Sequence, residues 1–150
     1  MRVFEVMTTR VKTTPSTAAA ADAWDVMRAA NIRHLVVKDG PAVVGIVSDT
    51  DLGGPNGSAV RAGCSVADLM QRRFASVTPD DTIRKAANLM AGRAATCVPV
   101  IRAGRLLGVV TAADLLALLG RGVDRPGHED RAAIHYRVPH RKTPVRRTAW

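Results

Sequence analysis

The chain has 150 residues, of which 47% are hydrophobic and 23% are charged, and its formal net charge is +9. This length is enough to bury a core as one compact body. No apolar run approaches the roughly 20 residues that a membrane-spanning helix needs, and the first residues lack the apolar stretch of a secretory signal. We therefore expect a cytoplasmic protein without a membrane partner.

The positive charge is concentrated near the C-terminus, where residues 121–150 hold eight Lys or Arg and only three Asp or Glu. With three prolines and few apolar side chains, this stretch is typical of a flexible basic tail. A basic tail can bind nucleic acid by neutralising phosphates. The chain has only five aromatic residues, however, so surfaces that stack on bases are scarce, which argues against a nucleic-acid partner.

Metal and redox chemistry find little support in the sequence. Cys64 and Cys97 form neither a closely spaced metal pair nor a disulfide framework. His128, His135 and His140 follow one another at spacings that match no recognised metal site. We predict no metal ligands and no catalytic residues.

In chain order, the first half predicts a strand, a helix, a β-hairpin and a glycine-rich linker. Residues before Thr14-Pro15 favour a strand, and good helix formers up to Asn31 favour a helix. Two valine-rich runs around the turn at Asp39-Gly40 favour a hairpin. The expected elements are a strand at 11–13, a helix at 18–30, strands at 35–37 and 43–47, a flexible linker at 53–58 and a short helix at 66–70.

The second half repeats this order 63 residues later. Residues 45–52 align without a gap on residues 108–115, and the same offset places Met27 on Met90. We expect both methionines, and Trp24, to be core residues. The matching elements are a strand at 75–77, a helix at 82–91 and strands at 98–101 and 106–110.

A fixed repeat indicates one supersecondary unit used twice, and each small sheet would be unstable alone. We predict an α/β (α+β) fold of two βαββα repeats that pack face to face about a pseudo-two-fold axis. Repeat 1 covers residues 1–57, a linker helix and repeat 2 cover 58–120, and the tail covers 121–150.

Both repeats carry a Thr-Pro pair before the long helix, at Thr14-Pro15 and Thr78-Pro79. Each ends with a glycine, two apolar residues, Ser or Thr, and an Asp three residues later. This ordered set resembles the cystathionine β-synthase (CBS) domain, and about residues 3–119 resemble a tandem CBS pair, or Bateman module.

The resemblance implies a homodimer with clefts between the repeats that take an adenosine-containing ligand such as AMP, ADP, ATP or S-adenosylmethionine. It also implies no required cofactor, and regulation of another protein in trans rather than catalysis.

Four candidate ligand-binding residues lie at the ends of the two hairpins. Ser48 and Thr111 each precede a predicted short helix, whose first backbone N–H groups favour a phosphate. Asp51 and Asp114 follow three residues later, and the resemblance implies that such an Asp accepts hydrogen bonds from a ribose diol. The same spacing is also that of a helix cap, so both interpretations stay open.

Arg33 and His34 precede the second strand of repeat 1, where the resemblance implies basic groups beside a phosphate. The matching residues in repeat 2 are Thr96 and Cys97, which supply no cation, so we do not expect two equal phosphate sites.

Thr14 and Thr78 complete the candidate set. The resemblance implies that backbone groups beside them read an adenine edge, although turn chemistry before proline also explains both residues.

Three functions therefore compete. The first is a regulatory module that binds an adenosine nucleotide between its repeats. The second is a ligand-free homodimeric adaptor or stress protein, which the missing cation at Thr96 and Cys97 favours. The third, less supported, is nucleic-acid binding through the basic tail.

Overall fold

A computed structural model describes residues 1–121 of the chain. Residues Met1–Leu115 form one compact unit. The predicted tail over 121–150 lies outside the described residues except for Arg121. Within residues 1–121 no helix has the length and hydropathy needed to cross a bilayer.

The first repeat contains the predicted strand, helix and hairpin. Its elements are β1 (Thr13–Thr14), α1 (Ala20–Ala30), β2 (His34–Asp39), β3 (Ala42–Ser48) and α2 (Ser58–Arg61). β1 runs parallel to β2, and β2 runs antiparallel to β3. α1 ends as predicted at Asn31, which adopts the left-handed conformation and donates its N–H to carbonyls of the last turn.

The second repeat contains α4 (Ile83–Arg93), β4 (Cys97–Arg102), β5 (Arg105–Thr111) and α5 (Ala112–Gly120). The predicted strand at 75–77 is reduced to one parallel bridge between Val77 and Val100. Proline explains the loss. In repeat 1 the Val36 N–H donates to the Lys12 carbonyl, but the residue matching Val36 is Pro99, which has no N–H to donate.

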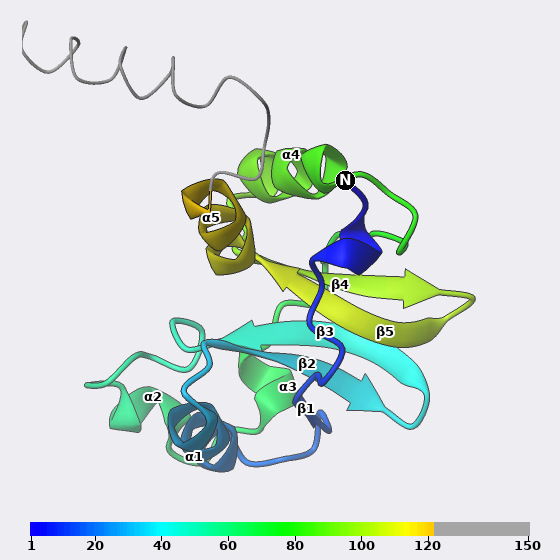
Figure 1. Ribbon diagram of the computed structural model, residues 1–150. Helices are drawn as coiled ribbons and strands as arrows, with labels where there is room; N and C mark the ends of the chain where they lie inside the picture. The colour runs from blue at the N-terminus through cyan, green and yellow to red at the C-terminus, as the bar shows by residue number, and fades with distance from the viewer. Residues whose placement is uncertain (122–150) are drawn as a thin grey trace, which may run out of the picture. The chain divides into compact units, whose positions relative to one another are not determined.

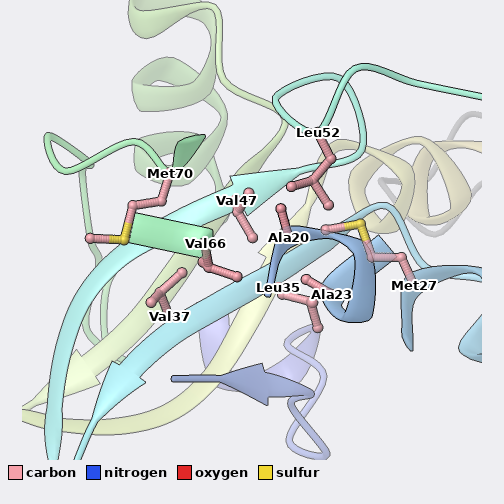
Figure 2. Packing of buried hydrophobic residues seen from close by; sticks show 9 residues of the cluster. All are labelled: Ala20, Ala23, Met27, Leu35, Val37, Val47, Leu52, Val66 and Met70. Carbon is pink, nitrogen blue, oxygen red and sulfur yellow. The ribbon is translucent and has the colours of Figure 1, made fainter. Parts of the chain in front are cut away.

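The two repeats exchange their leading segments. α3 (Val66–Leu69) precedes repeat 2 in the sequence, yet Val66 and Met70 are buried in the core of repeat 1 (Figure 2). The matching segment, the 3₁₀ helix η1 (Val3–Glu5), places Val3 in the core of repeat 2. The predicted boundary between 57 and 58 thus follows the sequence repeat, whereas each core includes residues from both sides of it.

The hairpins lie next to each other in the middle of the unit, with β3 in contact with β5. α4 covers the far side of β4 and β5, whereas α1 covers the far side of β2 and β3 (Figure 1). Met27 and Met90 are buried in the respective cores, and Trp24 packs against the first core, which confirms the prediction for these residues.

The exchange depends on two close backbone contacts that the repeats share. The N–H and carbonyl of Gln71 pair with those of Ile46 at 2.8 and 3.0 Å, and Thr8 pairs in the same way with Val109 at 2.9 and 3.0 Å. At each contact, the backbone of the exchanged segment lies directly against a glycine of the hairpin. A Cβ at Gly45 would lie 2.8 Å from the Gln71 carbonyl oxygen, and one at Gly108 would lie 2.8 Å from the Thr8 carbonyl oxygen.

The linker between the repeats is more ordered than predicted. The Arg61 side chain is 7% exposed, and one of its nitrogens donates to the carbonyls of Leu52 and Gly54, at 2.8 Å each. Its guanidinium also lies 4.2 Å from the centre of the Trp24 ring. One buried cation therefore holds the glycine-rich turn against the core, a role that glycine content alone did not indicate.

Substitution of the two contact glycines tests the exchange. Gly45→Ala and Gly108→Ala should each lower the free energy of unfolding by about 1 to 3 kcal/mol, because the added methyl group meets backbone atoms that cannot turn away. Gly92→Ala is the matched control, since nothing lies within 4 Å of its added Cβ and alanine favours a helix. Urea denaturation measures all three, and an equal effect at all three positions would contradict the packing argument.

Candidate functional site

A cleft of about 570 Å³ opens at the seam between the repeats. Repeat 1 contributes the start of β2 and the end of β3, and repeat 2 contributes the end of α4 and the start of β4. The segment that follows α3 forms another wall. The lining residues are Arg33, His34, Ile46, Ser48, Asp49, Thr50, Asp51, Gln71, Arg73, Phe74, Ala75, Leu89, Arg93, Ala94, Ala95, Thr96, Cys97 and Val98.

Ser48 and Asp51 form a reciprocal cap at one end of the cleft. The Ser48 N–H donates to Asp51 Oδ2 at 2.9 Å, and the Asp51 N–H donates to Ser48 Oγ at 3.1 Å. The predicted helix after Ser48 is absent: the segment forms hydrogen-bonded turns that lead into Gly53 and Gly54, both with positive φ. The capping interpretation therefore describes these bonds, and the pair still lines the cleft.

Gln71 also contacts Asp51. Its side-chain amide lies 3.2 Å from Asp51 Oδ1 and 3.3 Å from Oδ2. The Gln71 backbone is held in place by its pairing with Ile46. The same exchanged segment that joins the two cores thus positions a side chain next to the cleft carboxylate.

His34 and Thr96 meet across the seam. His34 Nε2 lies 2.7 Å from Thr96 Oγ1, so side chains of the two repeats share a hydrogen bond. Burial lowers the pKa of His34 below its ordinary value of 6.5, opposed by the negative charges of Asp49 and Asp51, while Arg33 acts in the same direction as burial. The imidazole is therefore neutral at pH 7.

Four of the eight predicted site residues come together in this cleft, namely Arg33, His34, Ser48 and Asp51. Thr111 and Asp114 form the same reciprocal cap in repeat 2, with bonds of 2.9 and 3.2 Å, but they do not line it. Both repeats thus keep the cap, and only one cap faces this cleft.

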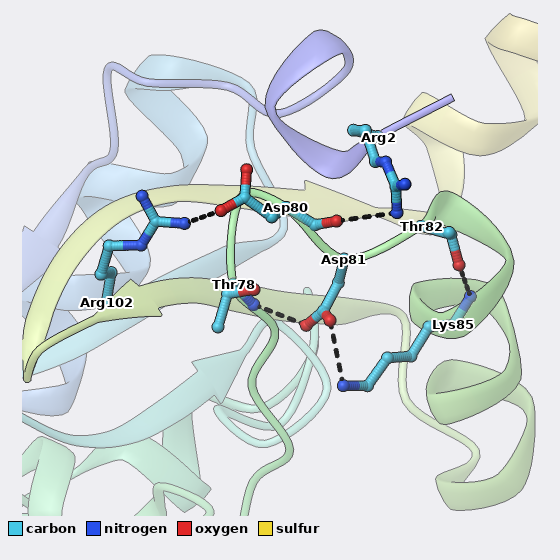
Figure 3. A network of polar contacts seen from close by, with 7 residues as sticks. All are labelled: Arg2, Thr78, Asp80, Asp81, Thr82, Lys85 and Arg102. Atoms are coloured by element: carbon cyan, nitrogen blue, oxygen red, sulfur yellow. Dashed lines mark hydrogen bonds and ion pairs between the residues drawn. The ribbon is translucent and has the colours of Figure 1, made fainter.

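The two predicted threonines also lie outside the lining. Thr14 is 6% exposed, and its hydroxyl donates to the Pro15 carbonyl at 3.4 Å. The Thr78 N–H donates to Asp81 Oδ2 at 2.8 Å, and Lys85 pairs with the same carboxylate at 3.1 Å (Figure 3). These are contacts of turns before a helix, as the alternative interpretation predicts.

The Asp81 carboxylate anchors this turn. Its bond from the Thr78 N–H, aided by Lys85, holds the pKa of Asp81 below its usual range. Thr82 then caps α4 by accepting a hydrogen bond from the Lys85 N–H. On the other side of the turn, Asp80 pairs with Arg102 and its carbonyl accepts from Arg2 (Figure 3).

Sequence reasoning missed several residues of the cleft. Arg73 and Phe74 precede the degenerate strand of repeat 2, and Arg93 is the last residue of α4. The 63-residue offset pairs Arg73 with Arg10 but pairs Arg93 with Ala30, so no repeat motif marks Arg93. Phe74 is an aromatic residue in a chain that has few, and this scarcity was the one signal that could have singled it out.

The sequence model of the CBS domain family matches this chain twice, at residues 3–52 and 66–121. The two matches together cover most of the chain. The chain belongs to the CBS domain family. The matched ranges leave out the linker that Arg61 holds in place.

Individual relatives agree with this assignment. A homoserine O-acetyltransferase of Methanococcoides burtonii is 32% identical over 121 residues, which is 79% of this chain and 24% of that protein. The CBS pair spans 16 to 24% of the length of the curated relatives that it matches.

Two solved structures share the fold. A CBS domain pair in complex with 5′-methylthioadenosine and S-adenosyl-L-methionine is 22% identical, with a TM-score of 0.74 over 81% of this chain and 98% of that one. A hexameric CBS-CP12 protein from bloom-forming cyanobacteria is 27% identical, with a TM-score of 0.67 over 77% of this chain and 66% of that one. The resemblance to a tandem CBS pair and the predicted α/β fold class are confirmed.

The cleft of this CBS pair contains one thiol, at Cys97. Burial, with a smaller contribution from the negative charge of Asp114, raises the pKa of Cys97 to about 12. The thiol therefore stays protonated at neutral pH and is a poor nucleophile. Within residues 1–121 no group of three or more His, Cys, Asp or Glu side chains is arranged to hold a metal ion.

The lowered pKa of His34 predicts a pH dependence of stability. The half-buried neutral imidazole contributes stability above the ordinary pKa of 6.5, and this contribution is lost as the pH falls through the lower folded-state value. The NMR titration midpoint of His34, assigned by the signal missing in His34→Gln, should lie below 6.5. Between pH 8 and 5 the wild type should lose more unfolding free energy than His34→Gln. A midpoint above 6.5 would contradict this.

Proposed function

We propose that this CBS pair is a regulatory module that binds an adenosine-containing ligand, such as AMP, ADP, ATP or S-adenosylmethionine, in the cleft at the seam. The observation that carries the proposal is that one cleft gathers Ser48, Asp51, Phe74 and three arginines from both repeats. A related fold binds 5′-methylthioadenosine and S-adenosyl-L-methionine, which supports the same ligand class here.

Each part of the ligand has a matching group on the walls. Asp51 offers carboxylate oxygens to ribose hydroxyls if Gln71 moves aside or shares them, and Ser48 lies beside it. Phe74 is half-buried and offers an apolar face to a base. The arginines offer donors to phosphate oxygens. The walls thus offer groups to the sugar, to the base and to the phosphates.

Regulation follows from where the walls come from. A ligand shifts a conformational equilibrium only by binding one state better than another. Because both repeats line the cleft, a change in the angle between them changes the spacing of its walls. We propose that this change is read by a partner protein in trans in the cytoplasm.

The module needs no cofactor and performs no catalysis in this proposal. We also propose that it forms a homodimer, since the related CBS-CP12 protein is itself oligomeric. Light scattering coupled to gel filtration measures the mass of the protein in solution, which should be that of two chains.

A thermal shift screen tests ligand binding. A ligand at 100 times its dissociation constant adds about 2.7 kcal/mol of stability, which raises the Tm of a domain of this size by roughly 5 to 10 °C. The screen comprises AMP, ADP, ATP and S-adenosylmethionine. Asp51→Asn should shrink the ligand-induced shift, whereas Asp114→Asn, the matched change in the other repeat, should leave it in place because Asp114 does not line the cleft.

Two results of the screen would contradict the proposed ligand site. If none of these compounds raises the Tm of the wild type, the ligand-free homodimeric adaptor becomes the better account. Equal loss in Asp51→Asn and Asp114→Asn would place the ligand elsewhere than in this cleft.

A further inference from the structure

The Gln71 side chain occupies the carboxylate that the proposed ligand needs. Its amide nitrogen lies 3.2 Å from Asp51 Oδ1 and 3.3 Å from Oδ2. A carboxylate only accepts hydrogen bonds, so the amide turns its nitrogen and not its oxygen toward Asp51. Oδ2 also accepts from the Ser48 N–H at 2.9 Å, whereas Oδ1 accepts from Gln71 alone among residues 1–121. Gln71 therefore covers the oxygen that the cap leaves open.

The other repeat lacks this contact at the matching position. Thr8 stands 63 residues before Gln71, and its backbone makes the same antiparallel pairing with a hairpin. A threonine hydroxyl is bonded directly to Cβ, whereas the glutamine amide nitrogen lies two bonds further out. Within the described part of the chain, Asp114 accepts from the Thr111 N–H and from no side chain. The difference between the two copies at this one position thus covers one carboxylate and leaves the other uncovered.

The contact can open without a rearrangement of the fold. The Gln71 backbone is fixed by its two hydrogen bonds to Ile46, and α3 just before it packs into the core of repeat 1. Asp51 is fixed to the same repeat by the Ser48 cap. The Gln71 side chain itself is exposed, so rotation of this side chain is enough to uncover Asp51. Opening therefore does not require a change in the angle between the repeats.

The contact is also weak enough for a ligand to displace. An N–H group that bonds strongly to a carboxylate lies about 2.7 to 2.9 Å from the oxygen, so distances of 3.2 and 3.3 Å describe a loose bond shared between both oxygens. A hydrogen bond of this kind corresponds to roughly a three- to tenfold preference for the closed arrangement. The apparent affinity of a ligand falls by the fraction of molecules that are open.

We infer that Gln71 is a gate on this cleft: its amide competes with the ribose hydroxyls of the ligand for Asp51, and the bound ligand displaces it. The inference rests on the proposed function and adds a regulatory contact to it. A ribose diol donates through two O–H groups, so it can replace the amide at Oδ1 while the Ser48 N–H keeps its bond to Oδ2. A 2′-deoxyribose has one hydroxyl fewer, so its binding depends less on whether Asp51 is uncovered.

Calorimetric titration of the full chain tests the gate. The ligands are AMP, ADP, ATP and S-adenosylmethionine, together with the 2′-deoxy counterparts of the nucleotides. Gln71→Thr gives repeat 2 the residue that repeat 1 has at the matching position, and so removes the competing amide. It should raise the affinity for the ribose ligands by about three- to tenfold. The gain for the 2′-deoxy compounds should be smaller, whereas a general change in the packing of the cleft would affect both kinds alike.

Arg72→Thr is the matched control for this substitution. It also introduces the residue of the matching position in repeat 1, Thr9, and Arg72 is exposed and lies outside the cleft. This variant should not raise the affinity for any of the ligands. In an Asp51→Asn background, Gln71→Thr should give no gain either, because the carboxylate for which amide and ribose compete has been removed.

NMR observes the contact in the absence of ligand. The side-chain amide signals of Gln71 are assigned as the pair that is missing in Gln71→Thr. They should move in Asp51→Asn, because the charge of their acceptor is gone. If these signals stay in place, the contact does not form in solution and the gate is overturned, whichever ligand binds.

The titrations separate the gate from the proposed function. If the wild type binds an adenosine compound and Gln71→Thr binds it equally or more weakly, the gate is overturned and the ligand-binding function stands. An equal gain for ribose and 2′-deoxyribose nucleotides has the same meaning. If neither the wild type nor Gln71→Thr binds any of these compounds, both proposals fall.

Discussion

The structure depends on the antiparallel contact that each repeat makes with the leading segment of the other. Gln71 pairs with Ile46 and Thr8 pairs with Val109, each over a glycine that lets two backbones approach. These contacts place η1 in one core and α3 in the other, so neither repeat completes its core without the other half of the chain. The same contact also carries Gln71 and the residues after it to the wall of the cleft.

The scaffold is repeated, but the side chains that the two repeats bring to this cleft differ. At the seam, Arg33 and His34 of one repeat face Thr96 and Cys97 of the other, and His34 hydrogen bonds to Thr96. These are matching positions in the two copies, so the pseudo-symmetry brings both sets into one place. Divergence of the copies at these positions changes the chemistry of the cleft without changing the hairpins that support it.

The two interpretations of the Ser-x-x-Asp spacing are not exclusive. The cap bonds are present in both repeats, which accounts for the conservation of spacing between the copies. In repeat 1 the capped carboxylate also lines the cleft and contacts Gln71, whereas in repeat 2 the capped carboxylate lies outside this cleft. A cap holds a carboxylate in one orientation, which is also what a pre-organised acceptor for a ligand requires.

Periodicity, turn residues and the 63-residue repeat were enough to predict the hairpins and both long helices, because these features depend on local chemistry, and the resemblance to the CBS domain then implied the fold. The resemblance to the CBS domain made Arg33, His34, Ser48 and Asp51 candidates, and of these Ser48 and Asp51 belong to a motif that both repeats carry. Pro99 shortened a predicted strand and Arg61 ordered a predicted linker through partners distant in the sequence. Only the tertiary structure decided which repeat's residues share a cleft. The exchanged segment brings Arg73 there and the packing of the two repeats brings Arg93, and no local pattern records such contacts between the halves of the chain.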